Sequence, residues 1–492
     1  MVGRIKQVDV VVVGGGNAGF SAAHAAAARG RRVVVLEKGE RDQAGGNSYY
    51  TAGAFRIAHN ELSSIADLLD DDERMPDSWL PPYREDDYLA DMAKVTSGRN
   101  DPELTAALVG DSQDTLRWLH GLGLGFRLMY ERQAYRDEAS GRFVFWGGLA
   151  VGSTGGGKGL IAQHTAAAEA EGVDIRYGAA ALDLLVEDGR VCGVTWRDAT
   201  GVVASMRADS VVLAAGGFEA DARMREEHLG EGWGRAKVRG TPLNTGDMLR
   251  AAMAIGAAPY GDWGSCHSVA WDARHPANES NRELTNQLTR GGYPLGIVVN
   301  SLGRRFLDEG ADYRNYTYAK YGAAILRQPG GIAFQVFDAP LRERLRAEEY
   351  DMPGASVVVA DTLEDLAAGM DVDPAALRRT VEEFNEGIDR AVPFDPAVKD
   401  GRASRVDPPK SNWAVPLEAP PFYAFPVTCG ITFTFGGLRA DTSARVLDGE
   451  GAPIPGLFVC GEMLGGLFSG NYPGGTGLTS GAVFGRRAGS LA

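Results

Sequence analysis

Cysteine is scarce in this sequence. Only four cysteines occur in 492 residues, and no two of them form a CxxC pair or another metal-ligand spacing: Cys192, Cys266, Cys429 and Cys460. A disulfide framework, an iron–sulfur cluster or a zinc site is therefore not expected. Such a chain suits a reducing compartment, and we expect a cytoplasmic location.

Long apolar runs are also missing. The apolar run at residues 8–13 follows a short basic start and ends at three glycines, so it is too short for the core of a signal peptide. No later run reaches the length that a bilayer-crossing helix needs. We expect no membrane span.

Basic residues are fewer than acidic ones, 50 against 65, which gives a net charge of −15. Such a surface repels phosphate backbones and anionic membranes, and we expect no nucleic acid partner. The chain is 44% apolar and too long for one ordinary domain. Two or three domains with a large core are expected.

Glycine, in contrast, is concentrated in a few motifs. Residues 14–19 read GGGNAG and follow the apolar stretch VDVVVV; an alanine-rich segment comes next, Gly30 ends it, and a second apolar stretch runs to Glu37. This order predicts strand, glycine turn, helix and strand, with an acid at the end. Glycines in such a turn let a pyrophosphate approach the helix N-terminus, while the acid accepts from ribose hydroxyls. The segment predicts a dinucleotide site.

Further glycine turns favour FAD over NAD as the dinucleotide. A second small-residue loop, AGGNSYYTAGAF, lies at residues 44–55, and the turns at Asp188-Gly189 and Thr200-Gly201 predict a β-meander that ends at Gly216-Gly217. Near the C-terminus GLFVCGEMLGG leads to Glu462, and NYPGGTGL opens a last helix. An extended cofactor such as FAD needs such distant turns, whereas a nicotinamide domain does not.

One motif is read as a decoy. GSTGGGKG, residues 152–159, fits GxxxxGK, but glycine follows the lysine where a nucleoside triphosphate site has a serine or threonine for magnesium. We expect this loop near the flavin or the substrate instead.

The ordered motifs resemble the fumarate reductase/succinate dehydrogenase flavoprotein superfamily, most of all its tricarballylate dehydrogenase-like branch. They include VVVGGGNAG, GGNSYYTAG, VVLAAGGF, NTGD, VVNSLGRRFLDEG, PGLFVCGEMLGG and NYPGGTGL. The resemblance implies FAD contacts from these residues: Gly14, Gly16, Ala18, Glu37, Lys38, Gly45, Gly46, Asn47, Ser48, Ala52, Gly53, Ala215, Gly216, Asp247, Glu462, Gly477 and Leu478. Some relatives tether FAD through a histidine in the loop that corresponds to residues 46–53; this loop has none, so noncovalent FAD is expected.

The flavin motifs stop near residue 262 and resume near residue 434. We therefore predict a mixed α/β and α+β fold: a discontinuous Rossmann-like FAD-binding domain with a β-meander, residues 1–262 and 434–492, and an inserted capping (substrate) domain, residues 263–433. Within the insertion, residues 341–349 and 361–389 are read as two charged helical segments.

The resemblance also implies the chemistry, which is oxidation or reduction of a C–C bond beside a carbonyl or carboxylate, with hydride transfer at flavin N5. By resemblance to soluble fumarate reductases, His267 and Arg290 lie at substrate-cleft positions and Arg314 lies near the place of the proton-donating arginine. This chain departs from those enzymes at three positions, with Phe433 for a histidine, Tyr472 for an arginine and Gln287 for a relay glutamate.

A second, partial resemblance concerns the 3-ketosteroid Δ1-dehydrogenases. NYPGGTG is similar to their Tyr-Pro-Gly segment, in which the tyrosine bonds the ketone, and this implies that role for Tyr472. A count of four residues from Glu309 places their catalytic tyrosine at Tyr313. Since adjacent side chains of an extended stretch point opposite ways, Arg314 and Tyr313 are alternatives for proton transfer, and Arg314 is favoured.

The function expected is thus an FAD-dependent desaturase or reductase of a C–C bond next to a carboxylate or ketone, with tricarballylate-like polycarboxylates as first substrate class and a cyclic ketone or ketosteroid desaturase as the alternative. A nicotinamide-dependent dehydrogenase and a non-enzymatic flavin sensor are disfavoured. The partners expected are a small-molecule substrate and an electron acceptor, namely oxygen, a quinone or a separate protein.

Other polar residues receive structural interpretations. Arg304 and Arg305 are read as an exposed turn pair. The histidines on helical patterns are read as surface or satisfied core residues: His24, His120, His164 and His228.

Overall fold

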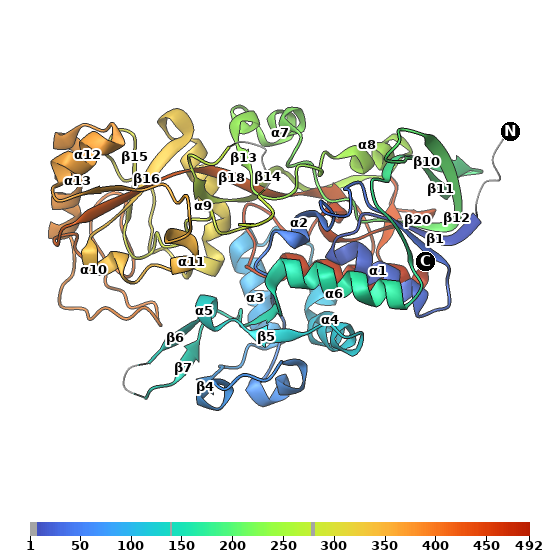
Figure 1. The fold of residues 1–492 in the computed structure, drawn as a ribbon, viewed down its shortest axis with the longest axis horizontal. Coiled ribbons are helices and arrows are strands. Elements are labelled where there is room, and N and C mark those ends of the chain that lie inside the picture. The colour runs from blue at the N-terminus through green and yellow to red at the C-terminus, as the bar shows by residue number, and fades with distance from the viewer. Residues whose placement is uncertain (1–6, 138–139, 277–280) are drawn as a thin grey trace. The chain divides into compact units, whose positions relative to one another are not determined.

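The computed structural model describes residues 7–137, 140–276 and 281–492. Its chain divides into two compact units: unit 1 contains Met1–Gly234, Gly240–Cys266 and Phe433–Ala492, and unit 2 contains Arg235–Arg239 and His267–Thr432. The element order of both units can be followed in Figure 1.

Unit 1 is built on an eight-stranded sheet. Its parallel core runs in the order β12-β1-β2-β9, and β20 pairs with β12 and with β19. The strands are β1 (Gln7–Val13), β2 (Val33–Leu36), β9 (Asp174–Arg176), β12 (Val203–Leu213), β19 (Arg445–Leu447) and β20 (Pro453–Val459). β1 ends in four valines and β2 reads VVVL; residues 10–13 and 33–36 are buried, as parallel strands covered on both faces must be.

The predicted β-meander extends this sheet. β10 (Ala180–Glu187) and β11 (Arg190–Arg197) pair antiparallel, and β11 pairs antiparallel with β12. Asp188 and Gly189 join the first two strands with positive φ angles of 47° and 74°. This is the backbone that a two-residue hairpin turn needs, which is why the Asp-Gly pair predicted it.

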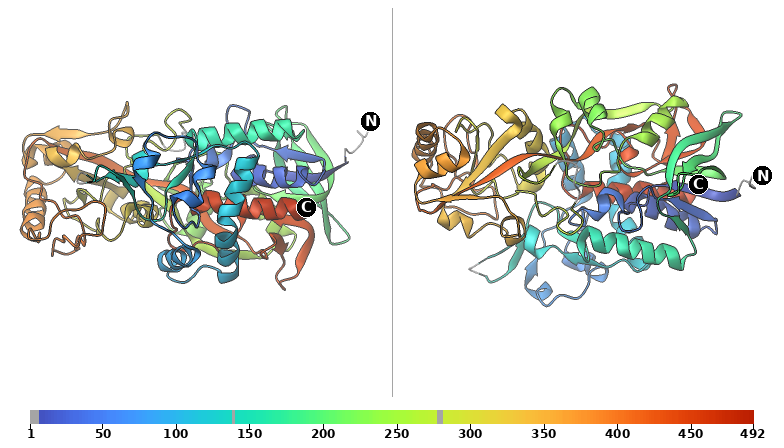
Figure 2. Two further views of the ribbon diagram at one scale, coloured as in Figure 1. Left: turned by 90° about the horizontal axis from the view of Figure 1, so that it is seen from below. Right: turned by 45° about the horizontal axis from the view of Figure 1, so that its top comes forward.

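Two helices of unit 1 approach each other so closely that the contact positions have no room for a Cβ atom. α1 (Asn17–Ala27) and α14 (Thr476–Leu491) run side by side (Figure 1, Figure 2). A Cβ added at Gly485 would overlap the carbonyl oxygen of Ala18, and one at Gly489 would overlap that of Ala22. Glycine therefore sets the distance between the helix that follows the first strand and the helix that ends the chain.

The remaining elements of unit 1 surround this core. Its helices are α2 (Gly46–Tyr49), α3 (Glu85–Thr96), α4 (Pro102–Gly121), α5 (Tyr130–Gln133), α6 (Gly156–Ala170), α7 (Ala222–Leu229) and α8 (Asp247–Ala254). Two small sheets have the orders β3-β8-β5 and β4-β7-β6. Their strands are β3 (Ala54–Phe55), β4 (Ser78–Trp79), β5 (Phe126–Leu128), β6 (Ala134–Arg136), β7 (Phe143–Phe145) and β8 (Val151–Ser153).

Unit 2 has its own sheet, in the order β13-β18-β16-β15, with β14 and β17 also paired to β18. Its strands are β13 (Lys237–Val238), β14 (Pro259–Asp272), β15 (Ile297–Asn300), β16 (Ile332–Phe337), β17 (Val358–Ala360) and β18 (Phe422–Leu438), of which β14 and β18 also include residues of unit 1. α12 (Leu363–Met370) and α13 (Pro374–Glu386) pack on this sheet through Leu366, Leu377 and Phe384.

Both helical segments expected in unit 2 prove to be broken. Residues 341–349 contain the end of α10 (Ala339–Arg342) and the start of α11 (Ala347–Tyr350), not one helix. Residues 361–389 divide into α12 and α13 at Asp371, whose φ of 58° is left-handed, with Pro374 opening the next helix. The charge pattern indicated helix correctly, but it did not locate the breaks. The other helix of unit 2 is α9 (Tyr318–Leu326).

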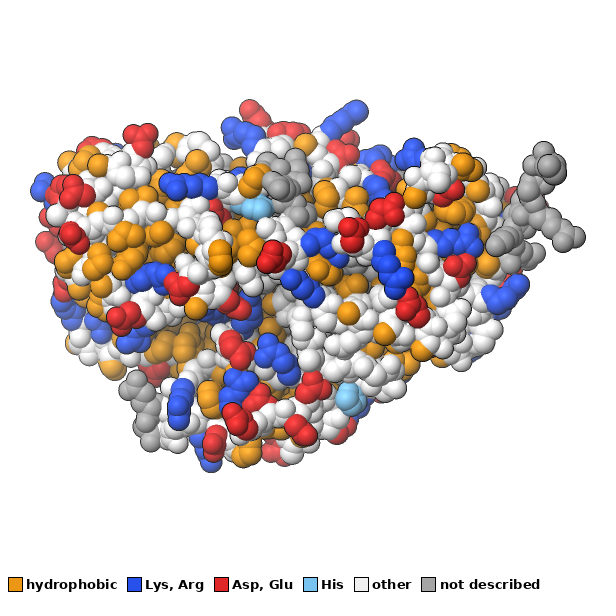
Figure 3. All heavy atoms as spheres, viewed as in Figure 1, with side chains coloured by type: hydrophobic (Ala, Val, Ile, Leu, Met, Phe, Trp, Pro, Cys, Tyr) orange, Lys and Arg blue, Asp and Glu red, His pale blue; other side chains and the backbone are white. Residues whose placement is uncertain are grey.

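Charged side chains of both signs are interspersed over the face drawn in Figure 3. Many form surface ion pairs, for example Arg32 with Asp9 at 2.6 Å and Arg405 with Asp389 at 3.1 Å. Among the residues that the structure describes, no helix is both long and apolar enough to cross a bilayer.

The contact between α1 and α14 predicts a stability difference. Gly489→Ala should destabilise the protein by about 1–3 kcal/mol, because the new methyl group would overlap a backbone carbonyl that cannot move freely. Gly110→Ala is the matched control, since this exposed position in α4 has open space around it and alanine favours a helix by about 0.5–1 kcal/mol. Thermal unfolding followed by circular dichroism measures both, and equal Tm values would contradict the close contact.

Candidate active site

Five helices of unit 1 begin after a glycine. The residues before their first turns are Gly16 for α1, Gly45 for α2, Gly155 for α6, Gly246 for α8 and Gly475 for α14, and none supplies a capping side chain. By contrast, Asp101 caps α4 and Asp221 caps α7 with their carboxylates. A glycine start leaves backbone N–H groups for an anionic or hydroxyl-bearing ligand. All of these starts except Gly155 lie in or beside the predicted FAD segments, and they fit that cofactor; Gly155 belongs to the loop expected near the flavin or the substrate.

The fingerprint turn is tightly packed. Gly14 has a φ of 109°, and a Cβ there would overlap the carbonyl oxygen of Ala214. At the end of β2, the buried Glu37 accepts hydrogen bonds from the backbone nitrogens of Gly15 at 2.8 Å and Gly39 at 2.7 Å. Glu37, the residue predicted to accept from the ribose hydroxyls, is therefore held beside the glycine turn.

The second small-residue loop packs on the same region. The backbone nitrogen of Asn17, inside the fingerprint, donates to Ser48 Oγ at 3.1 Å. Asn47 accepts from the backbone nitrogen of Thr241 at 3.0 Å, and its Nδ2 donates to Glu219 at 2.6 Å. A Cβ at Gly157 would overlap the backbone oxygen of Ser48, so the GxxxxGK motif read as a decoy packs directly on this loop.

A pair of buried glutamates lies among the later FAD segments. Glu462 accepts from the backbone nitrogen of Thr434 at 2.7 Å, and Glu219 accepts from Asn244 Nδ2 at 2.7 Å. Burial raises the pKa of both glutamates, and their proximity raises that of Glu219 further. The sequence analysis missed Glu219, although it stands directly after the strand-end motif VVLAAGGF.

The other predicted FAD residues also lie in unit 1. Lys38 donates to Asp247 at 2.8 Å, the backbone nitrogen of Ala215 contacts the sulfur of Met463 at 3.2 Å, and Leu478 accepts from Asn17 Nδ2 at 2.8 Å. Gly45, Gly46, Gly53 and Gly216 have left-handed φ angles, and Ala18, Ala52 and Gly477 complete the set.

Tyr472 belongs to an aromatic cluster of unit 1. Its ring centroid lies 5.1 Å from that of Phe433 and 5.4 Å from that of Phe468, both edge to face, and Phe435 joins the same cluster. The phenol is 7% exposed. Phe433 and Tyr472, which the resemblance matches to a histidine and an arginine of the soluble fumarate reductases, are here aromatic rings that pack on each other.

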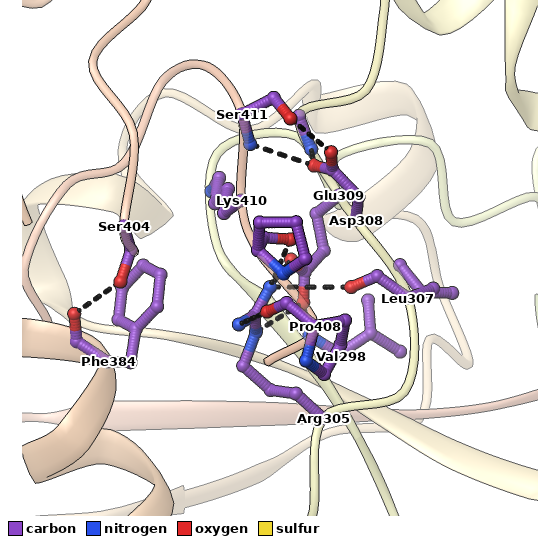
Figure 4. Close-up of polar contacts among 12 residues, drawn as sticks. Val298, Arg305, Leu307, Asp308, Glu309, Phe384, Ser404, Pro408, Lys410 and Ser411 are labelled. Carbon is purple, nitrogen blue, oxygen red and sulfur yellow. Dashed lines mark hydrogen bonds and ion pairs between the residues drawn. The ribbon is translucent and has the colours of Figure 1, made fainter. Parts of the chain in front are cut away.

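In unit 2, a set of buried charges anchors the stretch before Tyr313 and Arg314 (Figure 4). Arg305 donates through Nε to Glu309 at 3.1 Å and through a terminal nitrogen to the carbonyl of Pro408 at 2.6 Å. Glu309 also accepts from the backbone nitrogen of Val298 at 2.8 Å. The expectation that Arg304 and Arg305 are both exposed is wrong for Arg305, which is 8% exposed, because its partners come from the chain around Pro408.

Lys410 is the third buried charge of this anchor, which consists of Arg305, Glu309 and Lys410. Its Nζ donates to the carbonyl of Gly296 at 2.6 Å. Burial lowers the Lys410 pKa to about 7, although the neighbouring Glu309 carboxylate acts to raise it. Beside it, Asp308 accepts from the backbone nitrogen of Ser411 at 2.9 Å, and Ser404 Oγ donates to the carbonyl of Phe384 at 2.7 Å (Figure 4).

The two candidate proton-transfer residues point to different partners. Tyr313 donates its hydroxyl to the carbonyl of Ala397 at 3.2 Å, and its ring lies 5.8 Å from that of Trp413. Arg314 donates to the Glu349 carboxylate at 3.1 Å. The neighbouring side chains therefore have different partners. The stretch is not extended as expected, because Arg314 opens a short 3-10 helix, Arg314–Tyr316, that follows Tyr313.

Glu349 is a residue that the sequence analysis missed. It is 1% exposed and accepts from the backbone nitrogen of Gly291 at 3.0 Å and from Arg346 at 3.4 Å, besides Arg314. It supplies a carboxylate to Arg314 in a chain that has Gln287 at the relay position. No local pattern marks it, because it lies 35 residues from Arg314 in a short charged helix.

The two remaining predicted cleft residues are deeply buried. Arg290 is 0% exposed and pairs with Asp272 at 2.7 Å, which also accepts from the backbone nitrogen of Ser356 at 2.9 Å. His267 is 1% exposed and lies edge-on to Tyr318, with ring centroids 5.0 Å apart. Burial, aided by the charge of Arg239, holds the His267 pKa well below its usual value, so the imidazole is neutral.

The burial of Arg290 predicts a loss of stability on mutation. Arg290→Ala should cost about 3–5 kcal/mol, because it leaves the Asp272 carboxylate buried without its ion pair. Arg405→Ala is the control, since its pair with Asp389 has side-chain exposures of 78% and 32% and should contribute less than about 1 kcal/mol. Both are measured as Tm; an unchanged Tm with weakened substrate binding would instead identify Arg290 as a substrate contact.

The buried lysine predicts a pH-dependent stability. The folded-state pKa of Lys410 is about 7 and the pKa of an ordinary lysine is 10.5, so above pH 7 the unfolded chain binds more protons and stability rises with pH. Relative to Lys410→Met, wild type should gain about 2 kcal/mol between pH 7 and pH 9. Urea unfolding at each pH measures this gain. Lys320→Met, at an exposed lysine of the same unit, should leave the pH dependence of wild type unchanged, and parallel curves for Lys410→Met would disprove the shift.

Comparison with known proteins identifies the family of this chain. The family model described as FAD binding domain matches residues 9–478. The chain is 30% identical to the probable fumarate reductase Ifc3 of Shewanella frigidimarina, over 100% of this chain and 75% of that protein. It is also 30% identical to 4-oxocyclohexanecarboxylate 2-dehydrogenase of Sinomonas cyclohexanicum, over 96% of this chain and 90% of that protein.

Solved structures share the fold. The open conformation of a flavocytochrome c3 fumarate reductase has a TM-score of 0.74 at 26% identity and covers 99% of this chain and 78% of its own. The 3-ketosteroid Δ1-dehydrogenase of Sterolibacterium denitrificans has a TM-score of 0.75 at 23% identity, with 99% of each chain covered.

The predicted fold class, FAD as the cofactor and the assignment as an oxidoreductase are therefore confirmed. The resemblance to the fumarate reductase superfamily is confirmed as well. On a match that covers nearly all of its length, this chain belongs to the FAD binding domain family of fumarate reductase-like flavoproteins.

Proposed function

We propose that this FAD-dependent oxidoreductase desaturates, or reversibly reduces, a C–C bond next to a carbonyl group. The names of its relatives support reaction at a C–C double bond: besides fumarate reductases, the chain is 28% identical to a urocanate reductase of Eggerthella lenta and 27% identical to a vinyl phenol reductase of Lactiplantibacillus plantarum. FAD, held by the glycine-capped helices of unit 1, supplies the hydride chemistry. The electron acceptor is a separate protein, a quinone or oxygen.

The substrate class that the side chains support best is a cyclic ketone, including one that carries a single carboxylate. The observation that carries this choice is Tyr472, whose ring packs with Phe433 and Phe468. A phenol among aromatic rings offers one hydrogen-bond donor to a ketone oxygen and apolar surface to a ring. A tricarballylate-like substrate, with three carboxylates, instead needs several cations, and Arg290 is already paired with Asp272.

Proton transfer is proposed for Arg314 with Glu349. A guanidinium has a pKa above about 12 and needs a carboxylate partner to pass on a proton. Glu349 contacts both Arg314 and Arg346, whose side chain is 23% exposed, so the three groups form a path from the buried carboxylate toward solvent. Tyr313 donates its own proton to a carbonyl and packs on Trp413, which suits a supporting role.

FAD binding is proposed to be noncovalent. Residues 46–53, the loop in which some relatives carry the tethering histidine, contain no histidine. The bound flavin should therefore leave the chain when the protein is denatured.

Variants of the two adjacent residues test the proton-transfer assignment. Arg314→Ala should slow flavin reduction by at least about 10²-fold while FAD stays bound, because a general acid–base group contributes roughly 10²–10⁴-fold. Glu349→Gln should slow it in the same direction, whereas Tyr313→Phe should cost much less. Stopped-flow flavin absorbance measures the rates. A crippled Tyr313→Phe beside a mild Arg314→Ala would reverse the roles.

Anaerobic bleaching of the flavin tests the substrate class. We expect cyclic ketones such as 4-oxocyclohexanecarboxylate to reduce the flavin faster than tricarballylate or succinate, with Tyr472→Phe removing most of the difference. The same preparation, precipitated with acid, should release its yellow colour into the supernatant. Bleaching by tricarballylate alone would instead support polycarboxylates as the substrate class. Colour that stays with the precipitate would disprove noncovalent FAD binding.

A further inference from the structure

Four side chains of unit 1 form a hydrogen-bonded chain that the proposed reaction does not use. Glu171 Oε2 lies 2.6 Å from His24 Nδ1, His24 Nε2 lies 3.1 Å from His164 Nδ1, and His164 Nε2 lies 3.1 Å from Asn17 Oδ1. Both histidines are 0% exposed, on the neighbouring helices α1 and α6 (Figure 1). We call these four residues the histidine chain.

The inner end of the histidine chain joins separate FAD segments. Asn17 is part of the fingerprint, its backbone nitrogen donates to Ser48 Oγ at 3.1 Å, and its Nδ2 donates to the carbonyl of Leu478 at 2.8 Å. One residue therefore links the first glycine turn, the second small-residue loop and the start of α14.

The hydrogen bonds of the chain have only one consistent direction. Because Asn17 Nδ2 donates to Leu478, its Oδ1 faces His164 and must accept, so His164 carries its proton on Nε2. His164 Nδ1 then accepts from His24 Nε2. Since His24 Nε2 donates to His164, the 2.6 Å contact between His24 Nδ1 and Glu171 Oε2 joins two acceptors unless one of them is protonated. One proton must therefore be shared in this contact.

The surroundings support this proton. Glu171 follows the last residue of α6, where the helix dipole disfavours a carboxylate unless a cation is close, and His24 lies in the last turn of α1, where a cation is favoured. Phe20 stacks on His164 with ring centroids 5.6 Å apart, and Trp118 lies edge-on to His24. Burial lowers the His164 pKa well below its usual value, with a further contribution from His24, which keeps His164 neutral.

Charged groups on neighbouring helices also lie near the histidine chain. Arg486 of α14 lies over the Trp118 ring, 5.1 Å from its centroid, and pairs with Asp114 of α4 at 2.6 Å. This pair is separated from His24 by the indole, so Glu171 is the carboxylate that contacts the imidazole directly.

We propose that His164 is a positioning residue for FAD: it orients the Asn17 amide so that the three FAD segments stay joined, and the proton shared by His24 and Glu171 fixes that orientation. The histidine chain thus couples a partly exposed carboxylate at the end of α6 to the cofactor fingerprint. The proposal requires FAD at the fingerprint but not the proposed substrate or proton donor, so flavin retention tests it without turnover.

Three variants of the holoprotein separate positioning from packing. His164→Leu removes the donor to Asn17 and should raise the FAD dissociation constant at least about tenfold, as expected for a lost buried hydrogen bond. Glu171→Leu leaves His24 without its partner and should raise it about three- to tenfold. Glu171→Gln should change it less than about twofold, because the glutamine amide can donate to His24 Nδ1 and preserve the direction of the chain.

Flavin fluorescence released on dilution of the holoprotein gives these constants. Glu169→Leu is the matched control on the same helix, since Glu169 is half exposed and pairs with Arg41 at 2.8 Å, and it should retain FAD like wild type. If Glu171→Leu and Glu171→Gln retain FAD equally, the shared proton has no role and the proposal fails. This pair decides the matter even if His164→Leu does not fold.

A tautomer measurement tests the histidine chain in the wild-type protein, with substitutions used only to assign the signals. With only seven histidines in the sequence, ¹⁵N-labelled imidazoles can be resolved and assigned by single substitutions. His164 should be the neutral Nε2–H tautomer, with Nδ1 unprotonated. A proton on His164 Nδ1, or unchanged FAD affinity in a folded His164→Leu, would overturn the proposal.

Discussion

Close approach of backbone to backbone at glycine is the constraint on which unit 1 depends. Side chains at Gly19, Gly485 or Gly489 would overlap carbonyl oxygens of α1 or of the turn before it. The same holds at Gly157, where α6 meets the second small-residue loop. Because these helices also begin at glycine, close packing and open N–H groups come from the same residue type, and the fold and the cofactor site share one cause.

Unit 2 depends on a different interaction, the buried ion pair. Arg305 pairs with Glu309, Arg290 with Asp272 and Arg314 with Glu349. Burying such charges contributes little net stability, but removing one partner is costly, so the pairs specify a single arrangement of the loop before Arg314. That loop holds the two residues between which the sequence left the proton transfer open.

How much could be predicted from the sequence follows from this difference. Glycine turns, valine strands and the Asp188-Gly189 hairpin depend on residues that are adjacent in the sequence. The sequence therefore predicts them directly, and the FAD-binding fold was predictable. Arg305 was misread because its partners at Pro408 and Pro409 lie more than 100 residues away. Glu349 was missed for the same reason, since nothing near it in the sequence indicates that it contacts Arg314.

Burial also separates arginines that the sequence could not distinguish. Arg290 has a fully buried side chain, which donates to the Asp272 carboxylate and to backbone carbonyls including that of Gln287 at 3.1 Å. Arg314 keeps 13% of its side chain exposed while it pairs with Glu349. A group that hands a proton to substrate must reach it, whereas a group enclosed by its own partners must first break a buried ion pair. The same residue type thus supports structure at Arg290, whereas at Arg314 its partial exposure suits the proton transfer that we propose.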